Sequence, residues 1–163
     1  MNYNYRRYPY PFRVDPPMYN IDCRNRMGPR DYGPYPFSFN ISEATKANDN
    51  FRTTVWTGKH LQLTLMSIPA GGEIGLEVHH FLDQFLRIEE GCGMVLMGSA
   101  ENKLDYRENV ADGYAIFVPA GIWHNLINTS NKPIKLYSIY SPPAHAPGTI
   151  HRTKEESDYA EEH

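Results

Sequence analysis

From residue 50 onward the chain alternates short apolar or β-branched runs with turns rich in glycine and proline. The runs recur roughly every ten residues and cover residues 51–57, 60–68, 84–89, 94–97, 114–118, 124–128 and 134–140. Short strands separated by such turns are typical of an all-β sandwich or barrel. We therefore predict a small all-β barrel, in which Glu90-Gly91-Cys92-Gly93 forms a hairpin turn between two adjacent strands.

Length and charge limit the kinds of protein that this chain can be. Its 163 residues suit one domain with extensions, and 40% of them are apolar, which is enough for a packed core. The net charge of −3 does not favour nucleic acid as a partner. No apolar run reaches the roughly 18 residues of a membrane span, and the first residues lack the apolar core of a signal peptide. We expect a cytoplasmic protein with neither a membrane nor a nucleic-acid partner.

Composition divides the chain into three parts. Residues 1–39 hold seven of the 12 tyrosines, seven of the 13 prolines and six arginines, but no lysine. Because repeated proline blocks both helices and strand ladders, we predict an extended, mobile arm there. The barrel should occupy residues 40–145, and a charged tail residues 146–163. The arm could pack loosely over the barrel, reach a neighbouring subunit, or serve as an adhesive segment of the kind that layered protein coats use.

Helical signals lie only at the two ends of the barrel segment. Ser42 is a suitable N-cap for a short helix that ends near Asn48. Near the other end, residues 153–162 are charged and compatible with a helix, although a frayed, solvated tail would have the same composition. The two cysteines, at positions 23 and 92, fall in no C-x-x-C pair, so we expect free thiols rather than a thiolate zinc site.

Four side chains on separate predicted strands could converge on one metal ion. Glu77 and His79 are two residues apart, so on a strand they point to the same side. Gln84 begins the next strand, in phase with its apolar inward face, and His124 follows a proline–glycine turn far along the chain. Imidazole and carboxylate groups suit divalent transition metals. We predict a site for one such ion, Fe, Mn, Zn, Ni or Co, with Glu77, His79, Gln84 and His124 as ligands.

Neighbouring residues offer alternatives to this ligand set. His80 adjoins His79 and should face the other side of a regular strand, but a β-bulge could turn it inward. Asp83 could replace Gln84 after a slip of one residue. His145 and His151 lie in a proline-rich segment near the end of the chain, and we expect both at the surface.

The two segments that carry these residues resemble the paired motifs of the cupin superfamily, of the phosphomannose isomerase-like kind. The first family pattern is G-x5-H-x-H-x3–4-E-x6-G, and the second is G-x5-P-x-G-x2-H-x3-N. This chain keeps the spacing of the first, from Gly71 to Gly91, and every residue of the second, from Gly113 to Asn128. The resemblance covers about residues 50–142. It implies a double-stranded β-helix, or jelly roll, a bound metal and a homodimer, for which residues 40–60 are our candidate contact.

Two ligand positions depart from the family pattern. Glu77 stands where the family has its first histidine, and Gln84 stands where the family has its glutamate. The ligand charge is unchanged, because one carboxylate has moved from one position to the other. The strong ligands would then be Glu77, His79 and His124, a set of two histidines and one carboxylate such as non-haem Fe(II) oxygenases use. Gln84 would bind the metal directly or hold a metal-bound water, and Asn128 would secure a turn through its amide.

Several functions are compatible with these features. The first is a metal-dependent enzyme with a small-molecule substrate, either an oxygenase or a sugar isomerase; a sugar phosphate would need cations such as Arg87 and Lys59. The second is a non-catalytic metal-binding barrel with a structural role, because the tyrosine- and proline-rich arm resembles bacterial spore-coat material. The third is a barrel that senses or stores a small ligand.

Overall fold

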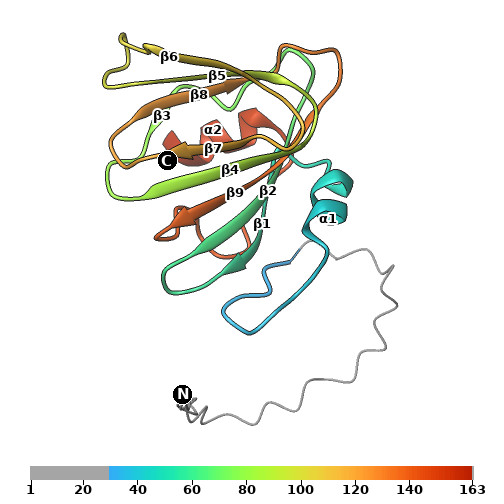
Figure 1. The fold of residues 1–163 in the computed structure, drawn as a ribbon. Coiled ribbons are helices and arrows are strands. Elements are labelled where there is room, and N and C mark those ends of the chain that lie inside the picture. Colours follow the sequence, from blue (N-terminus) through green and yellow to red (C-terminus); the bar gives the residue numbers. More distant parts are fainter. Residues whose placement is uncertain (1–29, 163) are drawn as a thin grey trace, which may run out of the picture.

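Two antiparallel sheets face each other and enclose the interior of the protein (Figure 1). The computed structural model describes residues 30–162. One sheet has the strand order β10-β1-β2-β9-β4-β7, and the other has the order β3-β8-β5-β6. The arrangement confirms the predicted all-β double-stranded β-helix. Most of the predicted arm, residues 1–29, lies outside the described residues.

The helices and strands follow one another along the chain as short elements. In order they are α1 (Ile41–Ala47), β1 (Arg52–Thr57), β2 (Gln62–Ile68), β3 (Glu77–Val78), β4 (Asp83–Glu90), β5 (Gly93–Gly98), β6 (Tyr106–Val110), β7 (Ala115–Val118), β8 (Trp123–Ile127), β9 (Ile134–Ser141), β10 (Ile150–His151) and α2 (Lys154–Glu162).

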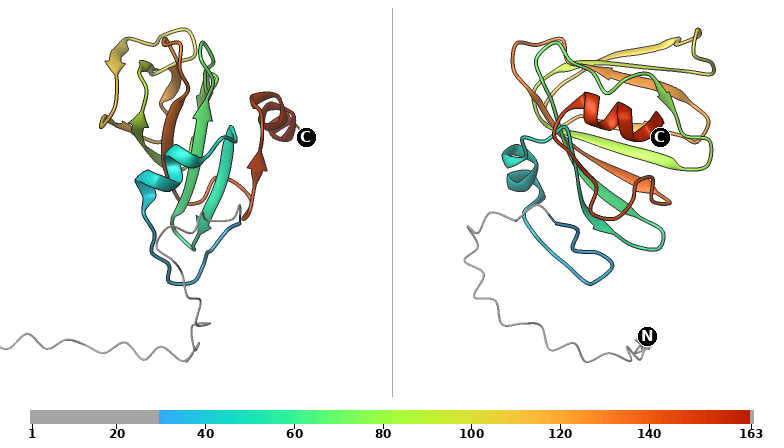
Figure 2. Two further views of the ribbon diagram at one scale, coloured as in Figure 1. Left: turned by 90° about the vertical axis from the view of Figure 1, so that its right-hand side faces the viewer. Right: turned by 180° about the vertical axis from the view of Figure 1, so that it is seen from behind.

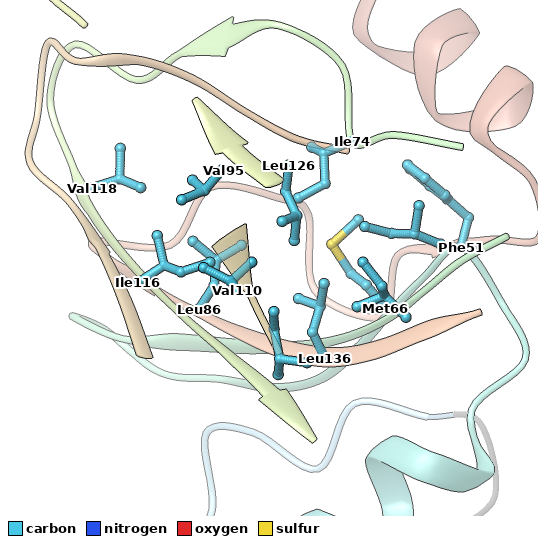
Figure 3. Close-up of a cluster of buried hydrophobic side chains, with 13 residues drawn as sticks. Phe51, Met66, Ile74, Leu86, Val95, Val110, Ile116, Val118, Leu126 and Leu136 are labelled. Carbon is cyan, nitrogen blue, oxygen red and sulfur yellow. The ribbon is translucent and has the colours of Figure 1, made fainter. Parts of the chain in front are cut away.

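The main hydrophobic core lies between the two sheets, because alternate residues of each strand point inward. Met66, Leu136 and Ile88 are opposite one another on β2, β9 and β4, and all three are fully buried. Val95 and Leu126 meet them from the facing sheet (Figure 3). The residues between them point outward from the six-stranded sheet and form a second cluster around Val55, Leu65 and Tyr137.

Helix α1 covers this outer cluster, and its N-terminus differs from the prediction. Asn40 is the N-cap, since its Oδ1 accepts a hydrogen bond of 3.1 Å from the Glu43 N–H. Ser42, the predicted cap, lies two residues further along and donates to Glu89 on β4 at 2.9 Å. The helix ends at Ala47, close to the predicted position.

The predicted hairpin at residues 90–93 is wrong. β4 belongs to the six-stranded sheet and β5 to the four-stranded sheet, so the turn carries the chain from one sheet to the other. The strands β6 and β10 were not predicted. β1 and β2 were predicted as strands, and they pair with each other, with a bulge near Trp56. Cys92 in this turn is exposed and has a free thiol.

Both ends of the described chain are held against the barrel. Tyr32 donates its N–H to Val55 at 2.8 Å, and the Asp31 carboxylate accepts from the N–H groups of Thr57 and Gly148 at 2.9 and 3.0 Å. At the other end, residues 154–162 form the helix α2, one of the two predicted alternatives. Among the described residues no helix has the length and apolar character needed to cross a membrane.

Helix α2 lies over the side of the barrel that faces away from the viewer in Figure 1 and is seen in full from behind in Figure 2. Arg52 on β1 donates to the Ser157 hydroxyl and, at 3.2 Å, to Glu161. On the other side, a Cβ atom at Gly75, just before β3, would lie 3.3 Å from the Lys154 ammonium. Helix α2 thus lies close to both β1 and the segment that precedes β3.

Candidate metal centre

Three of the four predicted ligands meet where β3 pairs with β8. Glu77 and His124 are direct partners in this antiparallel pair, which places their side chains on the same face. Glu77 Oε1 lies 3.1 Å from His124 Nε2 and 3.4 Å from His79 Nε2. The three potential ligand atoms all lie within 4.8 Å of one another. The structure thus confirms that Glu77, His79 and His124 form one cluster.

The turn before β8 fixes the two histidines. The Gly121 N–H donates to the His79 carbonyl at 2.7 Å, which anchors the backbone of His79, the residue that follows β3. Gly121 has a φ of 82°, a conformation that side-chain-bearing residues rarely adopt. His124 Nδ1 lies 3.0 Å from the Ile122 carbonyl of the same turn. A proton on Nδ1 would complete this hydrogen bond and leave the Nε2 lone pair directed at Glu77.

The donor and acceptor count of the cluster fits a cation. His124 has an acceptor oxygen next to each ring nitrogen, yet a neutral imidazole carries only one N–H. His79 Nε2 is buried and has no hydrogen bond within the described chain. Burial raises the pKa of Glu77, but its interactions with the imidazole rings of His124 and His79 outweigh this effect and hold the pKa well below its ordinary value. An ionised carboxylate and two imidazole nitrogens facing one point are a suitable set for a divalent transition metal.

The cluster lies at the boundary between the interior and solvent. The His124 side chain is only 3% exposed, whereas those of Glu77 and His79 are 19% and 21% exposed. A small molecule could therefore approach from the side of Glu77 and His79 while the opposite side stays closed. Such a site keeps positions free for a ligand, as catalytic metal sites do.

Gln84 also points into the barrel, from β4 in the sheet that faces the cluster. It is 3% exposed and lies opposite Tyr140 on β9 and Val118 on β7. Its amide nitrogen donates to the Ser138 hydroxyl at 2.9 Å, and its amide oxygen is buried without a hydrogen-bond partner in the described chain. The oxygen is thus available for a ligand, and direct metal contact by Gln84 stays a prediction.

The two alternative ligands, His80 and Asp83, make different contacts from the clustered residues. His80 is exposed, and its ring lies 6.2 Å from that of Phe81. Asp83 accepts a hydrogen bond of 2.9 Å from the Ala120 N–H and so supports the turn that holds His124.

Asn128 has the predicted structural role, since it donates to the carbonyls of Ile68, Pro69 and Lys132 at 2.7–3.0 Å.

Sequence reasoning missed a group of polar residues beside the cluster. Tyr140 is 1% exposed, and its ring lies edge-on to His79, with 5.8 Å between ring centroids. On its other side the ring of His145 lies 5.1 Å away, also edge-on. The prediction that His145 is a surface residue is therefore wrong: its Nε2 is buried. Arg52 is buried as well, although most arginines are exposed.

The fold and this cluster define a small β-barrel with a site that could hold a metal ion, and comparison with known proteins places it in a family. Residues 64–140 match the family model described as a cupin domain. The chain is 58% identical to the protein YrkC of Bacillus subtilis over 133 aligned residues. These residues make up 82% of this chain and 72% of YrkC. We conclude that the chain belongs to the cupin family.

Two further relatives extend this comparison. The crystal structure of BH2720 from Bacillus halodurans superimposes with a TM-score of 0.79 at 56% identity, covering 80% of this chain and 98% of that one. The protein L612 of Acanthamoeba polyphaga mimivirus is 43% identical over 112 residues, which is 68% of each chain. These likenesses agree with the observed fold.

Proposed function

We propose that this protein is a divalent-metal-dependent enzyme with a small-molecule substrate, and that Glu77, His79 and His124 hold the metal. The observation that carries the proposal is the convergence of one carboxylate and two imidazole nitrogens within 4.8 Å at a partly open edge of the barrel. A bound metal would supply Lewis-acid or oxygen chemistry at this edge. Together with the ionised Glu77 it would leave a net charge of +1, which favours an anionic oxygen of the substrate.

The residues around the cluster favour a hydroxylated substrate. Gln84 and His145 both flank Tyr140, and each carries a buried polar atom that a purely apolar substrate would leave unpaired. The phosphate of a sugar phosphate finds no support from Arg87, which is half-exposed and lies near Glu89 at 3.7 Å. Isomerisation of an unphosphorylated hydroxy compound therefore suits the surroundings best. The ligand set of two histidines and one carboxylate favours an Fe(II) oxygenase as the second candidate.

Elemental analysis of the purified protein tests the metal site. We expect about one transition-metal ion per chain in the wild type and a loss of at least 90% in His124→Ala. His80→Ala is the matched control, because it removes the exposed neighbouring histidine, and its metal content should equal that of the wild type. Equal metal content in His124→Ala and the wild type would refute the site. A metal-free wild type that also fails to take up added Zn(II), Co(II) or Fe(II) would instead favour a structural barrel.

A second experiment separates the two chemistries. The metal-loaded protein is incubated with a panel of small hydroxy acids and sugars, and products are followed by NMR while an electrode follows dissolved oxygen. Isomerase chemistry predicts conversion without oxygen uptake under Zn(II) or Co(II). Oxygen uptake that depends on Fe(II) and substrate would overturn isomerisation in favour of an oxygenase.

A further inference from the structure

Two imidazole rings flank the buried ring of Tyr140, and only one of them belongs to the metal cluster. His79 lies on one side and His145 on the other, both edge-on to the tyrosine. His145 comes from the segment after β9, whereas His79 follows β3. The C-terminal segment thus brings a histidine to the interior beside the metal centre.

Gln62 fixes the backbone of His145. Its amide oxygen accepts from the N–H groups of Ala144 and His145 at 3.1 and 2.9 Å, and its amide nitrogen donates to the His145 carbonyl at 2.8 Å. Gln62 is itself fully buried on β2. A fully buried amide that makes three hydrogen bonds to the backbone of one loop holds that loop in place. The inward position of His145 is therefore part of the fold.

The ring of His145 nevertheless has an unused polar atom. Its Nε2 is buried without a hydrogen-bond partner among residues 30–162. Other interior atoms share this condition, among them the amide oxygen of Gln84 and the hydroxyl of Thr54, and both residues are more than nine-tenths buried. Buried polar atoms are almost always paired, with protein, water or ligand. Gln84 is the strand partner of Tyr140, and both His145 and His79 pack against that tyrosine. The unpaired atoms of Gln84 and His145 therefore lie around Tyr140, beside the metal cluster, and favour a polar ligand there.

We propose that His145 is a substrate-binding residue, whose Nε2 makes a hydrogen bond with a hydroxyl group of a small hydroxy acid held at the metal centre. The inference rests on the proposed function, because the metal would bind the carboxylate end of the same molecule. A net charge of +1 at the metal selects an anionic oxygen, and the neutral polar groups of His145, Gln84 and Thr54 select hydroxyls rather than a second charge. Burial, together with the positive charge of Arg52, lowers the pKa of His145 to about 3, so its ring is uncharged near neutral pH.

The test compares two carboxylates that differ in their hydroxyl groups. The Co(II)-loaded protein is titrated with glycerate and with propionate, and binding is read from the visible spectrum of the cobalt. In His145→Phe the ring still packs against Tyr140 but cannot form hydrogen bonds, while His145→Gln keeps a polar group. The matched control is His60→Phe, the same change at an exposed histidine.

We expect glycerate to bind the wild type at least tenfold more tightly than propionate. His145→Phe should weaken glycerate binding about tenfold, the value of one hydrogen bond, and leave propionate and cobalt affinity unchanged. His145→Gln should restore part of the glycerate affinity, and His60→Phe should behave as the wild type. Unchanged glycerate affinity in His145→Phe, or equal binding of both acids to the wild type, overturns this inference and leaves the metal site standing. Failure of the wild type to bind cobalt overturns the proposed function itself.

Discussion

The interior of the barrel has an apolar end and a polar end, although the same strands build both. Toward one end β2 and β9 contribute the pair Met66 and Leu136; toward the other they contribute Gln62 and Tyr140. The first pair lies in the main hydrophobic core; in the second, Tyr140 packs against His79 and Gln62 holds the backbone of His145. The packed core and the polar cluster are thus separated along the strands, and we expect that one can be changed without the other.

The largest effect should come from the apolar end. Leu136→Ala removes a fully buried side chain from the centre of the core and leaves a cavity. We expect the free energy of unfolding to fall by about 2–5 kcal/mol, measured by urea denaturation. Metal affinity of the folded variant should stay within about threefold of the wild type. A large loss of metal affinity in the folded variant would show that the two ends are coupled.

At the polar end, pH should reveal the buried His145. Its pKa is about 3 in the folded protein, where burial and then Arg52 lower it, and roughly 6.5 in the unfolded chain. Between these values only the unfolded state takes up the proton, so stability is complete above about pH 6.5 and falls as pH decreases. The slope is about 1.4 kcal/mol per pH unit, or about 2 kcal/mol by pH 5.

This pH effect is measured best in metal-free protein, so that loss of metal does not contribute. Denaturation of the wild type and of His145→Phe is compared at pH 7 and pH 5. The charged groups that act on His145 are Arg52, Glu77, His79 and His151, and all are retained in the variant. We expect the wild type to lose more stability than the variant over this interval. Equal losses would contradict the buried, uncharged state of His145.

The smallest effect should come from a buried hydroxyl group, that of Thr54. Thr54→Val removes a buried hydroxyl that has no partner in the described chain, so it should stabilise the protein by about 1 kcal/mol or less. Thr45→Val is the matched control, because Thr45 is equally buried and its hydroxyl is also unpaired, but it lies on α1, away from the site. Glycerate binding should weaken only in Thr54→Val. Weakening in both variants would show that the hydroxyl acts through stability alone.

Local sequence patterns predicted the features that depend on local geometry. The i, i+2 spacing of Glu77 and His79, the proline–glycine turn before His124 and the resemblance to the paired motifs predicted that these three side chains converge, and they do. The helix near residue 41 was also predicted, although its cap was assigned to Ser42 rather than Asn40, two residues earlier. A cap depends on a single hydrogen bond, and both residues are suitable for it.

Features that depend on distant partners were missed. The glycine-rich turn at residues 90–93 resembles a hairpin, but the neighbours of β4 are β7 and β9, which occur later in the chain. His145 lies in a proline-rich segment without periodicity, and its inward position depends on Gln62, which is 83 residues away. No local pattern near His145 indicates this contact.

The metal affinity of Glu77→Gln tests the proposed metal centre most directly. This substitution keeps the shape of the side chain and removes the carboxylate around which both histidines are arranged. Competition with a chelator, measured with Co(II), should show binding at least about 100-fold weaker than in the wild type, equivalent to about 2.7 kcal/mol. The circular dichroism spectrum should be unchanged. A folded Glu77→Gln protein that binds cobalt as tightly as the wild type would contradict the assignment of this cluster as a metal centre.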